Sequence, residues 1–318
     1  MRILVAIDDN QATQPIIDAL IGTGWPNGTQ MLLTTVVTES KAGRTEKQHV
    51  TAVQKDLEAI GSELKAVLSH CEITVAVKEG DPREELIVLA NEMRADMVLM
   101  GSNNRSVGSV SQAVLNAAPC PVLIAKNDGD ALQDVQAGFR TVLVPFDNSV
   151  YSQTSLAWLL QFKWLQNASF ILLTIVDSQP QSADDEAIAV IQETLSMAAL
   201  QLQAGLHSAR VATRIAFGKP HEAILEAALE LQADLLVMGS HGHTGIQKMI
   251  LGSVSSEVSR RASCSVLVVR GLVKKDRTWQ RTGVMTLPKI THEAEEQPTY
   301  RKVNDCNDSP HVFPGGMH

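Results

Sequence analysis

The chain contains one sequence unit twice. ILVAIDDN at residues 3–10 matches VLVPFDNS at 142–149, an offset of 139, and ADMVLMGS at 95–102 matches ADLLVMGS at 233–240, an offset of 138. GDPREELI at 80–87 matches GKPHEAIL at 218–225 at that same offset, and the three matches keep their order. Because a repeat in the sequence indicates a repeated structural unit, we expect two copies of one domain, at residues 1–129 and 138–271.

Short apolar runs alternate with helical patterns in both copies. The runs in the first copy are ILVAI, MLLTTVV, EITVAV, DMVLM and PVLIA, and those in the second are TVLVPF, FILLTIV, VATRIAF, DLLVMG and SVLVVR. Several are continuously apolar, which is typical of strands buried on both faces. The alternation predicts an α/β fold with two tandem, doubly wound, five-stranded parallel-sheet domains of the Rossmann-like kind.

Helices between these strands are indicated by apolar residues at three- and four-residue spacing. The first copy has such a stripe at Val50, Val53, Leu57, Ile60, Leu64 and Val67, and the second repeats it at Ile188, Ile191, Leu195, Ala198 and Leu202. We interpret the stripe as the face that packs on the sheet. A partner-binding face is the alternative.

Composition excludes several classes of protein. The 318 residues include 44% apolar residues, enough for real cores, and 27 Lys and Arg against 35 Asp and Glu give a formal charge of -8. An acidic chain argues against nucleic-acid binding, which usually needs a cationic face. We also expect no membrane attachment, since no apolar run reaches membrane-spanning length, and a cytoplasmic location, since MRILVAI is too short for a signal peptide.

Two further features carry no predicted chemistry. The four cysteines, at 71, 120, 264 and 306, show no zinc-like spacing, and Cys120 and Cys264 are interpreted as buried thiols. Residues 272–318 mix charges and prolines with few clustered apolar positions, so a polar, disordered tail is expected. A short partner-binding segment in this tail is the alternative.

The second copy contains a glycine-rich segment, LLVMGSHGHTGIQKMILGSVSSEV, with glycines at 239, 242, 245 and 252. A loop of exposed N–H groups that leads into a helix N-terminus is a seat for an anion such as phosphate. Ser253 and Ser255 would add hydroxyl donors, and Asp147 follows another strand that ends at the same edge. Tight turns and close helix packing are the structural alternative for the glycines.

The spacing of Gly239, Gly242 and Gly252-Ser253 resembles the nucleotide-binding motif of the universal stress protein family. The resemblance extends from Ile3 to Lys126 and from Val142 to Arg270. It implies an adenine nucleotide alpha hydrolase-like domain that binds ATP, with Mg²⁺, and pairs of domains packed through their last strands.

The resemblance also implies a role for each matching residue in the second copy. Asp147 and Ile175 would flank the adenine and ribose, Pro145 would shape the end of the first strand, and Met238 and Gly239 would line the nucleoside. The phosphates would be held by Gly242, Gly252, Ser253, Val254 and Ser255. Lys248 would either reach the phosphates or lie in solvent, and His241 and His243 lack a third ligand for a metal site.

The first copy departs from this motif. It reads VLMGSNNRSVGSVSQAV, so Asn104 stands at the second glycine and six residues are missing before Gly108. Ala6 replaces Pro145, while Asp8, Ser109 and Ser111 persist. Because a shorter loop cannot wrap the same phosphate chain, we expect ATP in the second copy and no intact triphosphate site in the first.

The chain lacks the common catalytic signatures. GxxxxGK[ST], GxSxG and HExxH are absent, and GTGWPNG at 22–28 is interpreted as a turn. The leading hypothesis is therefore an ATP-dependent regulatory protein of the stress response with no predicted catalytic residue. A nucleotide-free assembly module and a slow, Asp147-dependent ATPase or self-phosphorylating enzyme are the alternatives.

PVLIA and SVLVVR are expected to pair the two domains. The sequence leaves open a homodimer of whole chains and an unknown protein partner.

Overall fold

A computed structural model describes residues 1–8, 13–38, 46–102, 107–126, 138–162, 164–165, 167–177, 184–206, 209–242 and 251–270. The contacts divide the chain after Lys274, and every described residue lies in the first unit. Asn104, His243, Lys248, Cys306 and the whole predicted tail lie outside the described residues. Residues 127–137 also lie outside the described residues. The predicted domain boundaries at 129 and 138 therefore stay a prediction.

Both halves alternate strands and helices in the predicted order. The first half consists of β1 (Arg2–Ala6), α1 (Thr13–Ile21), β2 (Gln30–Val37), α2 (Glu46–Val67), β3 (Glu72–Glu79), α3 (Pro82–Glu92), β4 (Met97–Gly101), α4 (Ser109–Ala117) and β5 (Val122–Ala125). The second consists of β6 (Thr141–Pro145), α5 (Val150–Phe162), β7 (Ser169–Val176), α6 (Asp185–Gly205), β8 (Arg210–Phe217), α7 (Pro220–Glu230), β9 (Leu235–Gly239), α8 (Ser253–Arg261) and β10 (Ser265–Val269). All ten predicted strands are confirmed.

The ten strands form one sheet in the order β3-β2-β1-β4-β5-β10-β9-β6-β7-β8. Neighbours within each half are parallel, as a doubly wound domain requires. The halves meet through β5 and β10, which pair antiparallel with Leu267 opposite Leu123. The expectation that PVLIA and SVLVVR meet is therefore confirmed.

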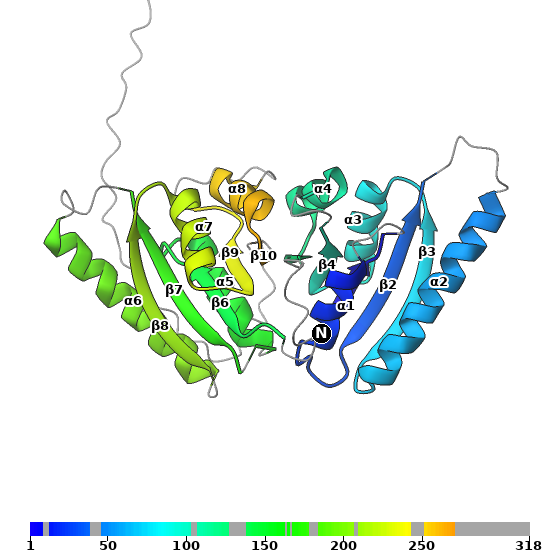
Figure 1. Cartoon of the computed structure of the whole chain (residues 1–318), viewed down its shortest axis with the longest axis horizontal. Helices are drawn as coiled ribbons and strands as arrows, with labels where there is room; N and C mark the ends of the chain where they lie inside the picture. Colours follow the sequence, from blue (N-terminus) through cyan, green and yellow to red (C-terminus); the bar gives the residue numbers. More distant parts are fainter. Residues whose placement is uncertain are drawn as a thin grey trace, which may run out of the picture. The chain divides into compact units, whose positions relative to one another are not determined.

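Helices cover both faces of the sheet, so the inner strands are buried on both sides, whereas the edge strands β3 and β8 are only partly buried. One core cluster contains residues of α1, α2, α5 and α6, and the other contains residues of α3, α4, α7 and α8. Figure 1 shows α2 beside β2 and β3, and α6 beside β7 and β8. This arrangement explains why the strand sequences are continuously apolar.

The predicted helical stripes form the buried faces of α2 and α6, with one exception. Leu57 and Leu64 of α2 are each 2% exposed, and Leu195 and Leu202 of α6 are buried in the same way. Val67 is 56% exposed, so its assignment to the buried stripe was wrong. It is the last residue of α2, and the core position at this end of the helix is taken by the next residue, Leu68, which is 3% exposed.

Two cations cross the boundary between the halves in a reciprocal arrangement. Lys126 follows β5, and its Nζ donates to the carbonyl oxygens of Ser259 (2.7 Å) and Ala262 (2.8 Å) at the end of α8. Arg270 follows β10, and its guanidinium donates to the carbonyl oxygen of Ala118 (3.2 Å), just after α4. Each half thus caps the C-terminus of a helix in the other, where the last carbonyls lack intrahelical partners. Burial lowers the pKa of Lys126 to about 8.

Candidate functional site

The carboxyl ends of β6, β7 and β9 carry the predicted nucleoside-binding residues. Pro145 is the last residue of β6, Ile175 lies near the end of β7, and Met238 and Gly239 end β9. Because β6 is parallel to both β7 and β9, these ends lie at one edge of the sheet. This edge is the topological switch point, where crossovers leave to opposite faces and open α/β sheets bind ligands.

At this edge, the first backbone N–H groups of helix α8 have no acceptor within the helix. Gly252 is its N-cap, with extended backbone (φ -62°, ψ 154°) and no side-chain cap. The first intrahelical bond runs from the N–H of Ser256 to the carbonyl of Gly252, so the N–H groups of Ser253, Val254 and Ser255 have no acceptor within the helix. Together with the helix dipole, they form a seat for an anion.

At three of the glycines in this segment, a side chain would be disfavoured for different physical reasons. A Cβ on Gly239 would lie 2.7–2.9 Å from atoms of Tyr151, so this glycine lets α5 approach β9. A Cβ on Gly252 would lie 3.1 Å from the carbonyl oxygen of Ser240. Both are thus accounted for by packing within the protein. Gly242 is the one that borders the predicted ligand site, since its Cβ would lie 3.0 Å from Oδ2 of Asp147.

Two predicted phosphate ligands have their polar groups engaged within the protein. Ser255 is buried, and its hydroxyl donates to the carbonyl oxygen of Gly239 (2.8 Å). The N–H of Gly252 donates to the carbonyl oxygen of Ser240 (2.9 Å). These bonds fasten the start of α8 to the end of β9. The hydroxyl of Ser255 therefore positions the helix, and its backbone N–H is the group directed by the helix toward an anion.

Asp147 is exposed and held by a turn. Its Oδ1 accepts from the N–H of Ser149 (3.0 Å), and Asn148 between them has a φ of 60°. Gln153 of α5 donates to the side-chain oxygen of Asn148 (2.9 Å) and stabilises this left-handed residue. The carboxylate is thus fixed beside Gly242 at the edge of the sheet.

His241 packs against a ring within the protein. Its imidazole lies 4.9 Å from the ring of Tyr151, and its Nδ1 is 3.1 Å from the hydroxyl of Ser240. Among the described residues, no group of three His, Cys, Asp or Glu could hold a metal ion. In the same part of the chain, no helix is long and apolar enough to span a membrane.

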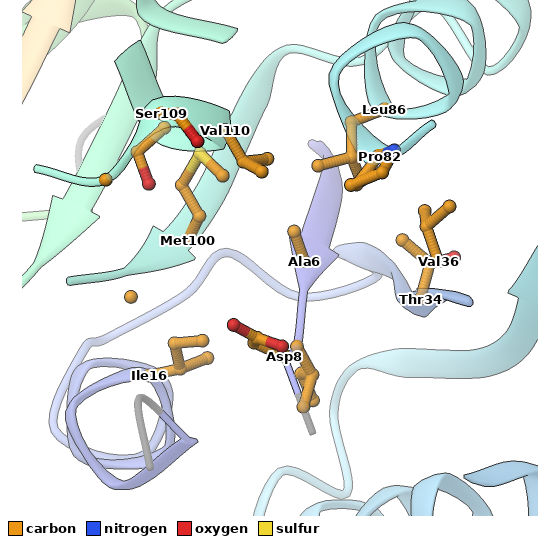
Figure 2. A pocket seen from close by; sticks show the side chains of 14 residues that line it. Ala6, Asp8, Ile16, Thr34, Val36, Pro82, Leu86, Met100, Ser109 and Val110 are labelled. Atoms are coloured by element: carbon orange, nitrogen blue, oxygen red, sulfur yellow. The ribbon is translucent and has the colours of Figure 1, made fainter. Parts of the chain in front are cut away.

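The first half contains a pocket of about 330 Å³ at the equivalent strand edge. It lies between the ends of β1, β2 and β4 and the start of α4, and Figure 2 shows Thr34 and Val36 on one side, with Met100, Ser109 and Val110 across from them. The sequence argument concentrated on the second half and did not single out Thr34. The two threonines in the otherwise apolar run MLLTTVV, Thr34 and Thr35, were the signal that could have found it.

Comparison with known proteins places these features in a family. A model of the universal stress protein family matches residues 1–126 and 138–270. A universal stress protein of Mycobacterium tuberculosis is 27% identical over 232 residues, which cover 69% of this chain and 74% of its own length. A putative universal stress protein of Staphylococcus aureus is 28% identical over 140 residues, 42% of this chain and 84% of its own.

A solved structure shares the fold over most of the chain. The crystal structure of a universal stress protein from Archaeoglobus fulgidus covers 85% of this chain and 98% of its own, with 22% identity and a TM-score of 0.62. A universal stress protein solved in complex with cAMP is 32% identical and covers 42% of this chain and 97% of its own, with a TM-score of 0.34.

Proposed function

The chain belongs to the universal stress protein family, and we propose that it binds ATP in the crevice of its second half and acts as a nucleotide-dependent regulatory protein. One observation carries the proposal. The start of α8 lies at the switch point of the sheet with three N–H groups that have no intrahelical acceptor, and Asp147 lies beside Gly242 at the same edge.

Each part of ATP has a proposed partner. The N–H groups of Ser253, Val254 and Ser255 would bind phosphate oxygens, and the exposed hydroxyl of Ser253 would add a donor. Asp147 would accept hydrogen bonds from the ribose hydroxyls. Ile175 and Pro145 are half-buried at the strand ends and offer an apolar surface to the adenine.

Met238, Gly239 and Gly252 would shape the crevice rather than hold ATP with their side chains. Met238 is 4% exposed and belongs to the core under the crevice, while Gly239 and Gly252 allow the close packing that sets the crevice wall. Mg²⁺ would arrive with the phosphates, because this ion commonly binds through substrate phosphates and one or two carboxylates.

The contacts of α8 support a regulatory role. The N-terminus of this helix forms the proposed phosphate site, and the carbonyls at its other end are capped by Lys126 of the first half. The N–H of Leu251, next to Gly252, donates to Oδ1 of Asn116 in α4 (3.3 Å). A change at the phosphate site therefore has two direct routes to the first half. The cytoplasmic location stays a prediction from the sequence.

Replacement of Ser253 by proline tests the phosphate site. Proline suits the first position of a helix, and the extended backbone of Gly252 is compatible with a following proline. The variant therefore loses one N–H donor and the hydroxyl while the helix is kept. Ser109→Pro is the matched control, since Ser109 is the first residue of α4 and follows Gly108, which is also extended.

We expect calorimetry of the full chain with MgATP to show one binding site that Ser253→Pro weakens by about tenfold or more, the effect of one hydrogen bond to a charged group. Ser109→Pro should leave this affinity unchanged. If wild-type protein takes up no ATP, or if both variants bind it equally well, the proposal fails and the nucleotide-free assembly module is favoured. Phosphate release that depends on Asp147 would instead favour the slow ATPase.

A further inference from the structure

Strand β3 has an open edge at one end of the sheet. It is the first strand in the order, and among the residues that the structure describes it pairs only with β2. Its sequence, EITVAVKE, contains neither proline nor glycine, so the edge is regular along its whole length. An open edge presents backbone N–H and C=O groups on which a further strand can pair.

The outward backbone groups belong to the odd-numbered residues of β3. The N–H groups of Glu72 and Gly80 donate to the carbonyl oxygens of Thr29 (2.8 Å) and Val37 (3.0 Å) on the β2 side. Because the backbone groups of successive residues in a strand point to alternate sides, the even-numbered residues between them also face β2. The N–H and C=O groups that point away from the sheet are therefore those of Ile73, Val75, Val77 and Glu79.

The two faces of β3 differ in chemistry. Ile73 is 4% exposed, and Val75 and Val77 are partly buried against the core cluster that contains residues of α2. Since side chains alternate along a strand, Glu72 and Lys78 lie together on the opposite face, where Glu72 is exposed and Lys78 is partly buried. One face of the edge is thus apolar, and the other has one charge of each sign near its two ends.

The sequence of β3 is self-complementary about Val75. When the strand pairs antiparallel with a second copy of itself centred on this residue, residues equally distant from Val75 lie opposite each other. Glu72 then lies opposite Lys78 of the partner subunit, and the two-fold symmetry forms this pair of opposite charges twice. The other facing pairs are apolar or small: Ile73 with Val77, Thr74 with Ala76, and Val75 with its own copy.

Val75 also has the backbone geometry for this centre. Its outward N–H and C=O groups would meet the same groups of its copy and exchange two hydrogen bonds, as in a hydrogen-bonded antiparallel pair. Glu72 accepts a hydrogen bond from Gln30 of β2 (2.9 Å), and its carboxylate can accept more than one donor. The backbone and the charges therefore fit one and the same register.

Lys78 favours a second copy over a strand of another protein. A lysine on an edge strand opposes pairing, because an incoming strand without a facing acid would desolvate the ammonium group without compensation. A copy of β3 brings Glu72 opposite this lysine, and the opposite charges offset that cost.

The other open edge, β8, lacks this pattern. At the offset of 138, Arg210 and Ala216 stand where β3 has Glu72 and Lys78, and β8 contains no acidic residue. The N–H of Arg210 donates to the β7 side, so the backbone groups of Thr213, in the middle of β8, point outward. This edge is therefore a matched control for β3.

We propose that β3 is an interaction surface for a second copy of this chain, and that two chains join through antiparallel β3 strands centred on Val75 with reciprocal Glu72–Lys78 pairs. The two halves of one chain are already joined by antiparallel edges, β5 and β10, and the same kind of joint extends the sheet beyond β3. This surface is separate from the proposed ATP site of the second half and does not depend on it.

Sedimentation of the full chain without nucleotide tests the proposal. We expect a reversible dimer whose fraction rises with protein concentration. Val75→Pro removes the central N–H groups without taking a bond from β2, and it should raise the dissociation constant of the dimer by about tenfold or more. Thr213→Pro makes the same change at the β8 edge and should leave the constant unchanged.

Charge reversal is a second test that leaves the backbone intact. Glu72→Lys places two lysines opposite each other in both pairs and should weaken the dimer by about tenfold or more, and Lys78→Glu should have the same effect with two acids. The double variant restores opposite charges in the reversed order and should recover most of the wild-type affinity. A general loss of strand stability would not be repaired in this way.

Several results would overturn the proposal. These are a chain that stays monomeric at every concentration, a dimer that Val75→Pro and the single charge variants leave intact, and a double variant that recovers no affinity. A dimer that only Thr213→Pro weakens would place the interface at β8 and would also overturn it. Because these readouts use no nucleotide, they are independent of the Ser253 test of the second half.

Discussion

The indole rings of Trp25 and Trp164 stack in parallel, with centroids 5.1 Å apart and an interplanar angle of 7°. The two residues are counterparts in the sequence repeat, at the offset of 139 that relates 3–10 to 142–149. They therefore meet as equivalent residues of two domains, as symmetric pairing of subunits would bring them together. Within the described residues they join the halves at a point separate from β5 and β10.

Removal of one ring of this pair should destabilise the fold. Trp25 is 4% exposed, and its Nε1 donates to the carbonyl oxygen of Leu20 (2.8 Å). We expect Trp25→Ala to lower the free energy of unfolding by about 3–5 kcal/mol, the usual cost of removing a large buried aromatic side chain. Urea denaturation followed by circular dichroism measures the change. Trp25→Phe keeps a ring in place and should lose clearly less; equal losses for both variants would contradict a stabilising stack.

The fold could be predicted from the sequence because its signals are local. Ten apolar runs and two helical stripes define the strands and the order of the elements, and the structure confirms both. The division into two domains, which follows from the repeat, stays a prediction. The pairing of β5 with β10 was expected from the family resemblance. The cap that Lys126 gives α8 was missed, because Lys126 and Ser259 are 133 positions apart and no local pattern links them.

The sequence predicted where the candidate site residues lie better than it predicted which groups their side chains contact. Pro145, Asp147, Ile175 and Gly239 all lie at the expected strand edge, since strand ends follow from the apolar runs. The sequence could not tell that the Ser255 hydroxyl bonds to Gly239, because hydroxyl partners depend on the packing of α8 against β9. Thr34 was visible as a polar residue, but its lack of a partner is a tertiary property.

Lys126 should make the stability of the chain depend on pH. Burial lowers its pKa from 10.5 to about 8, so between these values the unfolded chain binds a proton that the folded chain does not. Stability from this group therefore rises as pH increases from 8 toward 10.5, and it is lost as pH falls through 8. Relative to Lys126→Gln, which does not titrate, the wild type should gain about 2 kcal/mol between pH 7 and 9.5. Urea unfolding at both pH values measures this difference; a parallel pH dependence of the two proteins would contradict it.

Cys120 should be the least reactive of the described thiols. It is 3% exposed, and burial raises its pKa to about 12, so almost no thiolate forms near neutral pH. We expect a disulfide reagent at pH 8 to label at least one thiol fewer in the folded chain than in the urea-unfolded chain. Cys120→Ala should leave the folded count unchanged and lower the unfolded count by one. Loss of a rapidly labelled thiol in this variant would show that Cys120 is accessible.

Asn116 should couple the first half to ATP binding in the second. Its Oδ1 accepts from the N–H of Leu251 (3.3 Å), directly before the glycine that caps α8, so it helps to place the start of that helix. Asn116→Ala should therefore weaken MgATP by about threefold to tenfold, the range for one neutral hydrogen bond, although Asn116 lies outside the proposed crevice. Calorimetry measures the affinity, and Asn91→Ala is the control that should leave it unchanged, because Asn91 is an exposed asparagine of α3 whose amide donates to the carbonyl oxygen of Ile87 (2.9 Å) in the same helix. Equal affinities for wild type and Asn116→Ala would mean that the contact transmits nothing, and the regulatory route between the halves would then rest on Lys126 alone.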